Sequence, residues 1–178
     1  MNRRLPSELG NLSSLKLLVL VLAGVSTDEI SIPSEIANLS NMERLQLAGA
    51  NFLDPYWLEN AFSAMTNLRT ISILNSQFNS SGTMVPIIPT EIGLITTLKI
   101  IEVGVTDLKG TLPTELGQLT ELQRLVILKS DITGTIPTEL GLLTKLTRLS
   151  MVENSLTGTL PSELDSLTRL IDYVPPWA

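Results

Sequence analysis

Apolar residues recur along this chain in short alternating runs with a nearly constant spacing. Leucine and isoleucine occupy alternate positions of residues 125–127, and another leucine precedes that run by three residues. Alternation with a period of two predicts a half-buried β-strand. The same register predicts strands at residues 18–20, 45–47, 71–73, 101–103, 125–127 and 149–151, and a seventh that begins at 170–173 and ends before Pro175 and Pro176.

The segments between the strands repeat as well. Residues 108–127 and 132–151 follow nearly the same pattern, and Pro113, Pro137 and Pro161 are 24 residues apart. A fixed period in the twenties, with leucines in this register, is typical of a solenoid of stacked coils. We therefore predict an α/β architecture in which residues 1–178 form a single domain of six or seven coils, with the strands in one parallel sheet.

A Pro-Ser/Thr-Glu tripeptide opens most of the segments that return from one strand to the next. Proline suits the first position of a helix, because its missing N–H would be unpaired there. A glutamate two residues later complements the helix dipole, and glycines such as Gly117 and Gly141 then allow the chain to leave after about one turn. We predict short helical turns on the side opposite the sheet. The prolines are Pro6, Pro33, Pro89, Pro113, Pro137 and Pro161.

Two coils depart from this pattern. Asp54 followed by Pro55 predicts a helix of about two turns over residues 54–62, with the aspartate as its N-cap. We expect the aromatic side chains of this segment, with Phe52, to pack against neighbouring coils rather than to line a pocket. Residues 79–86 are a few residues longer than their counterparts, and such an insertion is either neutral or a contact for a partner.

Residues 156–164, Leu-Thr-Gly-Thr-Leu-Pro-Ser-Glu-Leu, resemble the L-x-G-x-I-P-x-x-L signature of plant-type leucine-rich repeats. That subclass occurs in receptor-like kinase ectodomains, in polygalacturonase-inhibiting proteins and in algal proteins. The resemblance implies a right-handed leucine-rich-repeat solenoid, with the parallel sheet on its concave face and the helical turns on its convex face. It also implies an additional short strand near residues 110–112, 134–136 and 158–160.

The chain departs from the family in two ways that bear on stability. The family keeps an asparagine after each strand, whose amide bonds adjacent coils; serine and threonine substitute for it in part, and alanine does not. The family's secreted members also carry cysteine-stapled caps, and this chain has no cysteine. We therefore expect the N-terminal coils to be less regular and less stable. The asparagine column reads Ala23, Ala50, Ser76, Thr106, Ser130 and Asn154.

The first coil has only four residues before Leu5, so we expect nothing in this sequence to cover the strand at 18–20. An unpaired apolar edge favours association. The alternatives are a longer parent protein, end-to-end self-association through the first coil, or N-terminal residues that fold over it. At the other end, Tyr173, Val174 and Trp177 are candidates for a lid. Residues 17–23 also resemble the apolar part of a signal peptide, but their register favours a core strand.

Composition excludes several classes of function. The net charge of −6 and the pI near 4.6 argue against nucleic acid or an anionic lipid surface as the partner, because both bind to basic faces. The absence of Cys and His removes thiol nucleophiles, imidazole bases and the usual zinc ligands. No apolar run reaches about 18 residues, the length that spans a bilayer. We expect no enzymatic activity, no cofactor and no metal.

The best candidate for a binding site is the concave face of the sheet. Three arginines form a partial column there, beside small and apolar residues, and arginine with desolvated apolar area dominates many interfaces. We predict a receptor-like, non-catalytic recognition module for a protein, peptide or glycan; the alternative is a structural or adhesive protein that self-associates. The candidate binding residues are Arg44, Gln46, Ser72, Leu74, Glu102, Arg124, Val126, Leu128, Arg148, Ser150 and Val152.

Two weaker signals concern the surface. Glycosylation sequons at Asn11, Asn38 and Asn79 favour, slightly, a secreted or cell-surface parent protein. The threonine pairs in residues 133–135 and 157–159 suggest an array that organises water as ice-binding surfaces do, although two copies are few for such an array.

Overall fold

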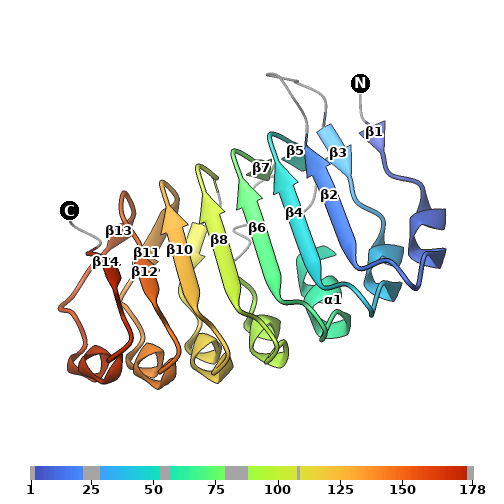
Figure 1. Cartoon of the computed structure of the whole chain (residues 1–178). Coiled ribbons are helices and arrows are strands. Elements are labelled where there is room, and N and C mark those ends of the chain that lie inside the picture. Colours follow the sequence, from blue (N-terminus) through green and yellow to red (C-terminus); the bar gives the residue numbers. More distant parts are fainter. Residues whose placement is uncertain (1–2, 22–28, 53–56, 79–87, 108, 176–178) are drawn as a thin grey trace.

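The strands of neighbouring coils form one parallel sheet, which faces the viewer in Figure 1. The computed structural model describes residues 3–21, 29–52, 57–78, 88–107 and 109–175. The sheet has seven strands in the order β14-β12-β10-β8-β6-β4-β2, which confirms every predicted strand. They are β2 (Leu17–Val21), β4 (Arg44–Ala48), β6 (Thr70–Leu74), β8 (Ile100–Gly104), β10 (Arg124–Leu128), β12 (Arg148–Ser150) and β14 (Asp172–Val174).

The core residues of adjacent coils lie opposite one another in register. Leu125 pairs with Ile101 on one side and with Leu149 on the other, and all three side chains are buried. Burial of each such side chain stabilises the fold by about 1.5–3 kcal/mol. Leu18 is buried at the end of the same arrangement, opposite Leu45, so the apolar run near the N-terminus is a core strand as predicted. The core is therefore a set of aliphatic columns that run through the stack.

The returning segments are five-residue 3-10 helices, which Figure 1 shows as a row along one edge of the stack. They confirm the predicted turns, but the proline lies one position earlier than predicted. Pro113 is the N-cap of its turn (φ −72°, ψ 142°), and its carbonyl accepts the first helical hydrogen bond from the Leu116 N–H at 3.2 Å. The turns are η1 (Ser7–Asn11), η2 (Ser34–Asn38), η3 (Thr90–Leu94), η4 (Thr114–Gln118), η5 (Thr138–Leu142) and η6 (Ser162–Ser166).

The glycines of these turns serve a different purpose from the predicted one. Gly117 lies inside η4 rather than after it, and the turn ends at Leu119 with φ −82° and ψ 58°. A Cβ atom on Gly117 would lie 2.6 Å from the Cβ of Glu139 and 2.7 Å from its carbonyl oxygen. Glycine is therefore needed because two successive turns approach each other closely.

The predicted longer helix is present as α1 (Trp57–Ala64). Its aromatic residues pack in the interior as expected: the ring centroids of Phe52 and Trp57 are 6.2 Å apart, and those of Phe52 and Phe78 are 5.1 Å apart. The proposed N-cap Asp54 and the insertion at residues 79–86 lie outside the described residues. Within those residues, no helix is both long and apolar enough to cross a bilayer.

Two smaller parallel sheets flank the main sheet. The first, predicted from the family, has the order β13-β11-β9, although its third strand ends before residues 158–160. The hydroxyls of Thr133 and Thr157 each donate to a carbonyl of the preceding coil at 3.2 Å, so these threonines connect coils. The second, which was not predicted, has the order β1-β3-β5-β7. The strands are β9 (Lys109–Thr111), β11 (Asp131–Gly134), β13 (Ser155–Leu156), β1 (Arg3–Arg4), β3 (Glu29–Ser31), β5 (Asn51–Phe52) and β7 (Gln77–Phe78).

At the position after each strand where the family keeps an asparagine, this chain has mostly other residues, and their hydrogen bonds differ. The Asn154 amide donates to the carbonyl of Ile127 in the preceding coil at 2.9 Å, and also to Met151 and Val152 of its own coil. Ser130 donates to the Leu128 carbonyl of its own coil, and its hydroxyl shares a 3.0 Å hydrogen bond with that of Thr106 in the preceding coil. Serine is too short to reach the backbone of the neighbouring coil, so this column joins the coils less strongly here than an asparagine ladder would.

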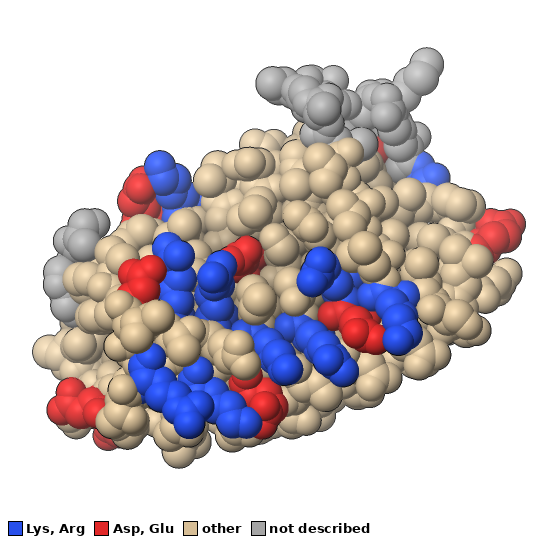
Figure 2. All heavy atoms as spheres, viewed as in Figure 1, with Lys and Arg blue, Asp and Glu red and all other residues tan. Residues whose placement is uncertain are grey.

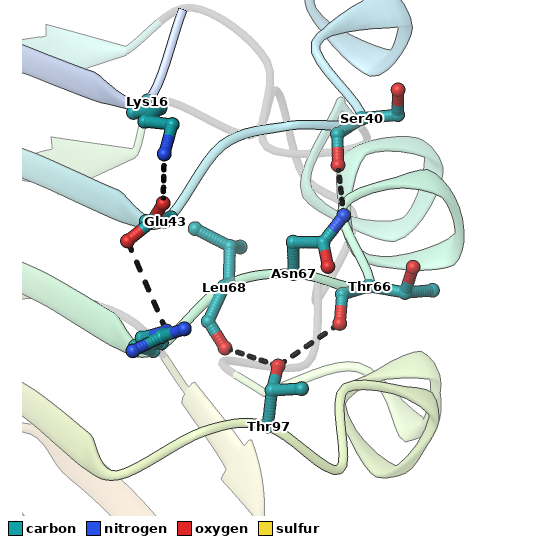
Figure 3. A network of polar contacts seen from close by, with 8 residues as sticks. Lys16, Ser40, Glu43, Thr66, Asn67, Leu68 and Thr97 are labelled. Atoms are coloured by element: carbon teal, nitrogen blue, oxygen red, sulfur yellow. Dashed lines mark hydrogen bonds and ion pairs between the residues drawn. The ribbon is translucent and has the colours of Figure 1, made fainter.

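A second polar column, on the segments that lead into the strands, supports the N-terminal coils. Asn67 donates its amide to the Ser40 carbonyl at 2.9 Å, and Thr97 donates its hydroxyl to the carbonyls of Thr66 and Leu68 (Figure 3). Asn41 makes the corresponding bond to the Ser13 carbonyl at 2.8 Å. These side chains thus add hydrogen bonds between coils at a second position of the repeat.

One residue in the turn after each of five strands adopts a left-handed backbone conformation. Gly49 and Asn75 suit this region, but Val105 also adopts it, with φ 54°. A β-branched residue at positive φ is strained, because its Cβ substituents crowd the backbone. Val105 is 52% exposed, so little packing offsets that strain.

Val105→Asn should therefore stabilise the protein, by about 1 kcal/mol, because asparagine tolerates the left-handed region. The measurement is the urea midpoint of unfolding followed by circular dichroism. The reverse change at the equivalent position, Asn75→Val, should lower the midpoint. A midpoint that falls with Val105→Asn would contradict the strain argument.

Candidate functional site

The exposed face of the main sheet carries the first, third and fifth residues of the five-residue strands, and the first and third residues of β12 and β14. The strand register aligns them across the coils: Arg124 lies beside Arg148, and Arg44 lies beside Thr70 and Leu17. This brings the predicted binding residues together on one face, in three parallel columns. The arginine column is at the start of the strands.

The middle column forms the floor of this face. Ser72, Val126 and Ser150 are only 5%, 9% and 3% exposed, because larger side chains on both sides cover them. Gln46 and Glu102 from the same column are half-buried. The three small residues therefore offer little area to a partner, and the flanking columns offer most of it.

The third column, at the ends of the strands, is apolar. Leu74 and Leu128 flank Gly104 in register, and both leucines are half-buried. Val152 is half-buried in the following coil, where its carbonyl accepts a hydrogen bond from Lys129 N–H. We call the set Val21, Ala48, Leu74, Gly104, Leu128 and Val152 the apolar column.

Basic side chains gather at the opposite end of the strands, over more positions than the arginine column alone. Figure 2 shows them as a band across the lower part of the viewed face, with acidic side chains interspersed. Each lies at the first residue of a main-sheet strand or within the three residues before it. The set, which we call the basic strip, is Lys16, Arg44, Arg69, Lys99, Arg124, Lys145, Arg148 and Arg169.

The basic strip reverses the average charge of the chain. It holds eight of the twelve Lys and Arg residues. Four carboxylates pair with it, those of Glu43, Glu102, Glu121 and Asp172. The strip with these acids therefore carries +4, and the rest of the chain carries −10. Sequence analysis missed it, because only the strand positions were compared and not the residues that precede them.

Ion pairs hold part of the strip in place. Lys16 Nζ lies 2.8 Å from Glu43 Oε1, and Arg124 Nη1 lies 2.8 Å from Glu102 Oε1. Arg148 Nε lies 3.1 Å from Asp172 Oδ2, a charge contact without the alignment of a hydrogen bond. All are partly exposed, so water screens these charges and each pair contributes little to stability. Among the described residues, no ion pair involves Arg44, Lys99 or Arg169.

The pKa values of two carboxylates that pair with the basic strip are lowered. The hydrogen bond that the Lys16 ammonium donates, and its charge, lower the pKa of Glu43, with a further contribution from Arg69. Lys145 lowers the pKa of Glu121 in the same way. Both carboxylates are therefore ionised at pH 7 and neutralise part of the strip. In Figure 3, Glu43 lies between neighbouring coils and connects them electrostatically.

Other candidate positions lie elsewhere. Asn11 is exposed at the end of η1, Asn38 is exposed at the end of η2, and Asn79 lies outside the described residues. Tyr173, one of the lid residues, belongs to β14, and burial raises the pKa of its hydroxyl; Trp177 lies beyond the described part. A cleft of about 440 Å³ lies among α1, η3 and η4, and the predicted binding residues do not line it.

The architecture is shared with leucine-rich-repeat proteins of known structure. A leucine-rich-repeat protein of Leptospira interrogans is 26% identical, with a TM-score of 0.72 over 96% of this chain and 39% of that one. A TDR receptor is 23% identical (TM-score 0.76; 97% of this chain, 28% of that one). The Arabidopsis receptor kinase HAESA ectodomain, solved with a peptide hormone ligand, is 24% identical (TM-score 0.71; 95% and 28%). The chain thus spans well under half of each. No known family model matches the sequence, and neither does any curated protein sequence.

Lys16→Met should raise the pKa of Glu43 toward its ordinary value of 4.5, because the largest cause of the lowered pKa is removed. Since the folded pKa is lowered, the pair stabilises the fold above the unfolded pKa of glutamate, and that contribution is lost as pH falls through the lowered value. An NMR titration of the side-chain carboxyl carbons measures the shift. Lys129→Met, which removes the partner of Glu153, is the control and should leave Glu43 unchanged. An unchanged Glu43 in Lys16→Met would refute the assignment.

Proposed function

This chain is a leucine-rich-repeat protein, and we propose that it is a non-catalytic, receptor-like recognition module that binds a protein or peptide on the exposed face of its seven-stranded sheet. The observation that carries the proposal is the arrangement of that face, where arginines and an apolar column flank a floor of small residues. Solenoids present extended surfaces of this kind to partners. Related folds include a receptor kinase ectodomain solved with a peptide hormone. A glycan is the less favoured partner, because the face offers few exposed polar groups other than charges.

The available side chains support a role without catalysis. The sequence has no His or Cys, so an imidazole base or a thiolate nucleophile is not available. The regularly repeated carboxylates, such as Glu115 and Glu139, lie in the first turns of the 3-10 helices, where they complement the local dipole. Their repetition therefore has a structural cause.

A change on the exposed face should weaken binding, whereas a matched change in a 3-10 turn should not. Peptides selected against this chain from a random display library would be measured by fluorescence anisotropy. Leu128→Glu should weaken them by at least about tenfold, because it places a charge on the apolar column. Leu142→Glu, in η5, is the control: Leu142 is 60% exposed and should tolerate the charge. Peptides that lose affinity only with Leu142→Glu would contradict the proposal.

A second candidate function is adhesion through self-association, and the exposed first coil favours it. Leu12, Leu17 and Val19 are each about half exposed, and β2 has no neighbour on its outer side among the described strands. An apolar surface beside unpaired strand edges is suited to pairing with another chain. The proposed contact is end to end, through the first coil.

If this contact forms, the mass measured by light scattering should rise above 19.4 kDa as the concentration increases. Leu12→Lys should then restore the monomer, because a charge would be buried in the contact, and Leu142→Lys in a middle coil should not. A monomer at every concentration, with the recognition face active, would remove this candidate.

A further inference from the structure

The exposed face of the sheet has opposite chemistry along its two edges. The basic strip lies at the beginning of the strands, and the apolar column lies at their ends. Residues four positions apart along a strand are separated by about 13 Å. Between them lies the middle column, in which Ser72 and Ser150 are almost inaccessible and Gln46 and Glu102 are half-buried. The result is a shallow track that crosses the strands, with cations on one side and aliphatic groups on the other.

We propose that this track binds an extended peptide segment whose side chains alternate between acidic and apolar residues. Successive side chains of an extended chain point in opposite directions. A segment that lies over the floor therefore directs one set of side chains toward the basic strip and the other toward the apolar column. This inference rests on the proposed recognition role and assigns the chemistry of the partner.

The cations available to such a segment are spread along the track. Arg44 belongs to the coil of β4, Lys99 to that of β8, and Arg169 to that of β14, and none of them is in an ion pair among the described residues. They span five steps between adjacent strands, or about 24 Å. An extended peptide of about seven or eight residues covers that distance. Carboxylates form strong charge-assisted hydrogen bonds with arginine, which favours acidic side chains in this position.

A single-stranded nucleic acid and an anionic polysaccharide would also complement the charge of the basic strip, but neither complements the rest of the face. A single-stranded nucleic acid gains much of its affinity from bases stacked on aromatic side chains. Among the described residues, Phe52, Trp57, Phe62 and Phe78 are buried, and Tyr173 pairs in register with the core residue Leu149 rather than with the exposed columns. An anionic polysaccharide would leave the apolar column uncovered. An acidic and apolar peptide uses both edges of the track.

The probe for this inference is a fluorescein-labelled octapeptide in which Glu and Leu alternate. It is titrated against the wild type and against the triple variant Arg44→Ser, Lys99→Ser, Arg169→Ser, which removes cations outside the ion pairs. The control triple variant, Arg4→Ser, Lys109→Ser, Lys129→Ser, removes the same charge from outside the basic strip. We expect binding about tenfold weaker for the first variant, and unchanged within about twofold for the control. Equal losses in both variants would overturn the inference, because they would indicate a response to net charge alone.

Matched probes test the pattern of the peptide. An octapeptide with four Glu followed by four Leu has the same composition without alternation, and it should bind at least about tenfold more weakly. An alternating Lys and Leu octapeptide should not bind at all. If a heparin fragment or a single-stranded oligonucleotide binds as tightly as the alternating probe, with the same loss in the first triple variant, the track recognises charge alone and the peptide assignment is wrong.

The recognition role and this inference fail in different ways. If library peptides bind in a manner sensitive to Leu128→Glu but not to the triple variant at Arg44, Lys99 and Arg169, recognition stands and the acidic partner is wrong. If neither library peptides nor the alternating probe respond to changes on this face, both fail. Binding of the probe that depends on the basic strip and also on Leu128 supports both.

Discussion

The whole structure depends on the in-register stacking of aliphatic side chains between adjacent parallel strands. Leu125 is buried because Ile101 and Leu149 lie on either side of it, not because it reaches a central core. Each coil is therefore stabilised only by its neighbours, and any side chain placed at one position of the repeat becomes part of a column along the molecule. The same geometry explains why Gly117 is required inside a turn, since the turns must approach as closely as the strands do.

Columns of polar side chains add hydrogen bonds to this stacking where the asparagine column that is typical of the family is incomplete. Among the described residues of this column, Asn154 bonds the backbone of the preceding coil, whereas Ser130 bonds the backbone of its own coil and shares a hydrogen bond with the Thr106 hydroxyl of the preceding coil. Earlier in the chain, Asn41, Asn67 and Thr97 make equivalent bonds before the strand. Backbone carbonyls of the N-terminal coils are thus bonded from a different position of the repeat. The lower stability expected for these coils stays a prediction, which concerns the column after the strands.

The sequence predicted what depends on local periodicity and left out what depends on contact between coils. The strands and the turns were predictable because alternation and the Pro-Ser/Thr-Glu tripeptide are local signals, and the helix at Trp57–Ala64 was predictable from Asp54 and Pro55. The role of Gly117 and the sheet β1-β3-β5-β7 were not, because both arise from the distance between neighbouring coils. For the site, the columns on the face were foreseen, but the near-complete burial of Val126 depends on the side chains on either side of it.

The basic strip shows why average charge is a poor guide to the partner of a repeat protein. Glutamates accumulate in the 3-10 turns because a negative charge is favourable in a first turn, and this places one acidic residue per coil away from the sheet. The cations lie at a different position of the repeat, at the start of the strands. There, Arg44, Lys99 and Arg169 form no ion pair among the described residues. A net charge of −6 consequently coexists with a face that carries +4. Since exposed charges act over about 8 Å at physiological salt, a partner on the sheet experiences the strip rather than the total.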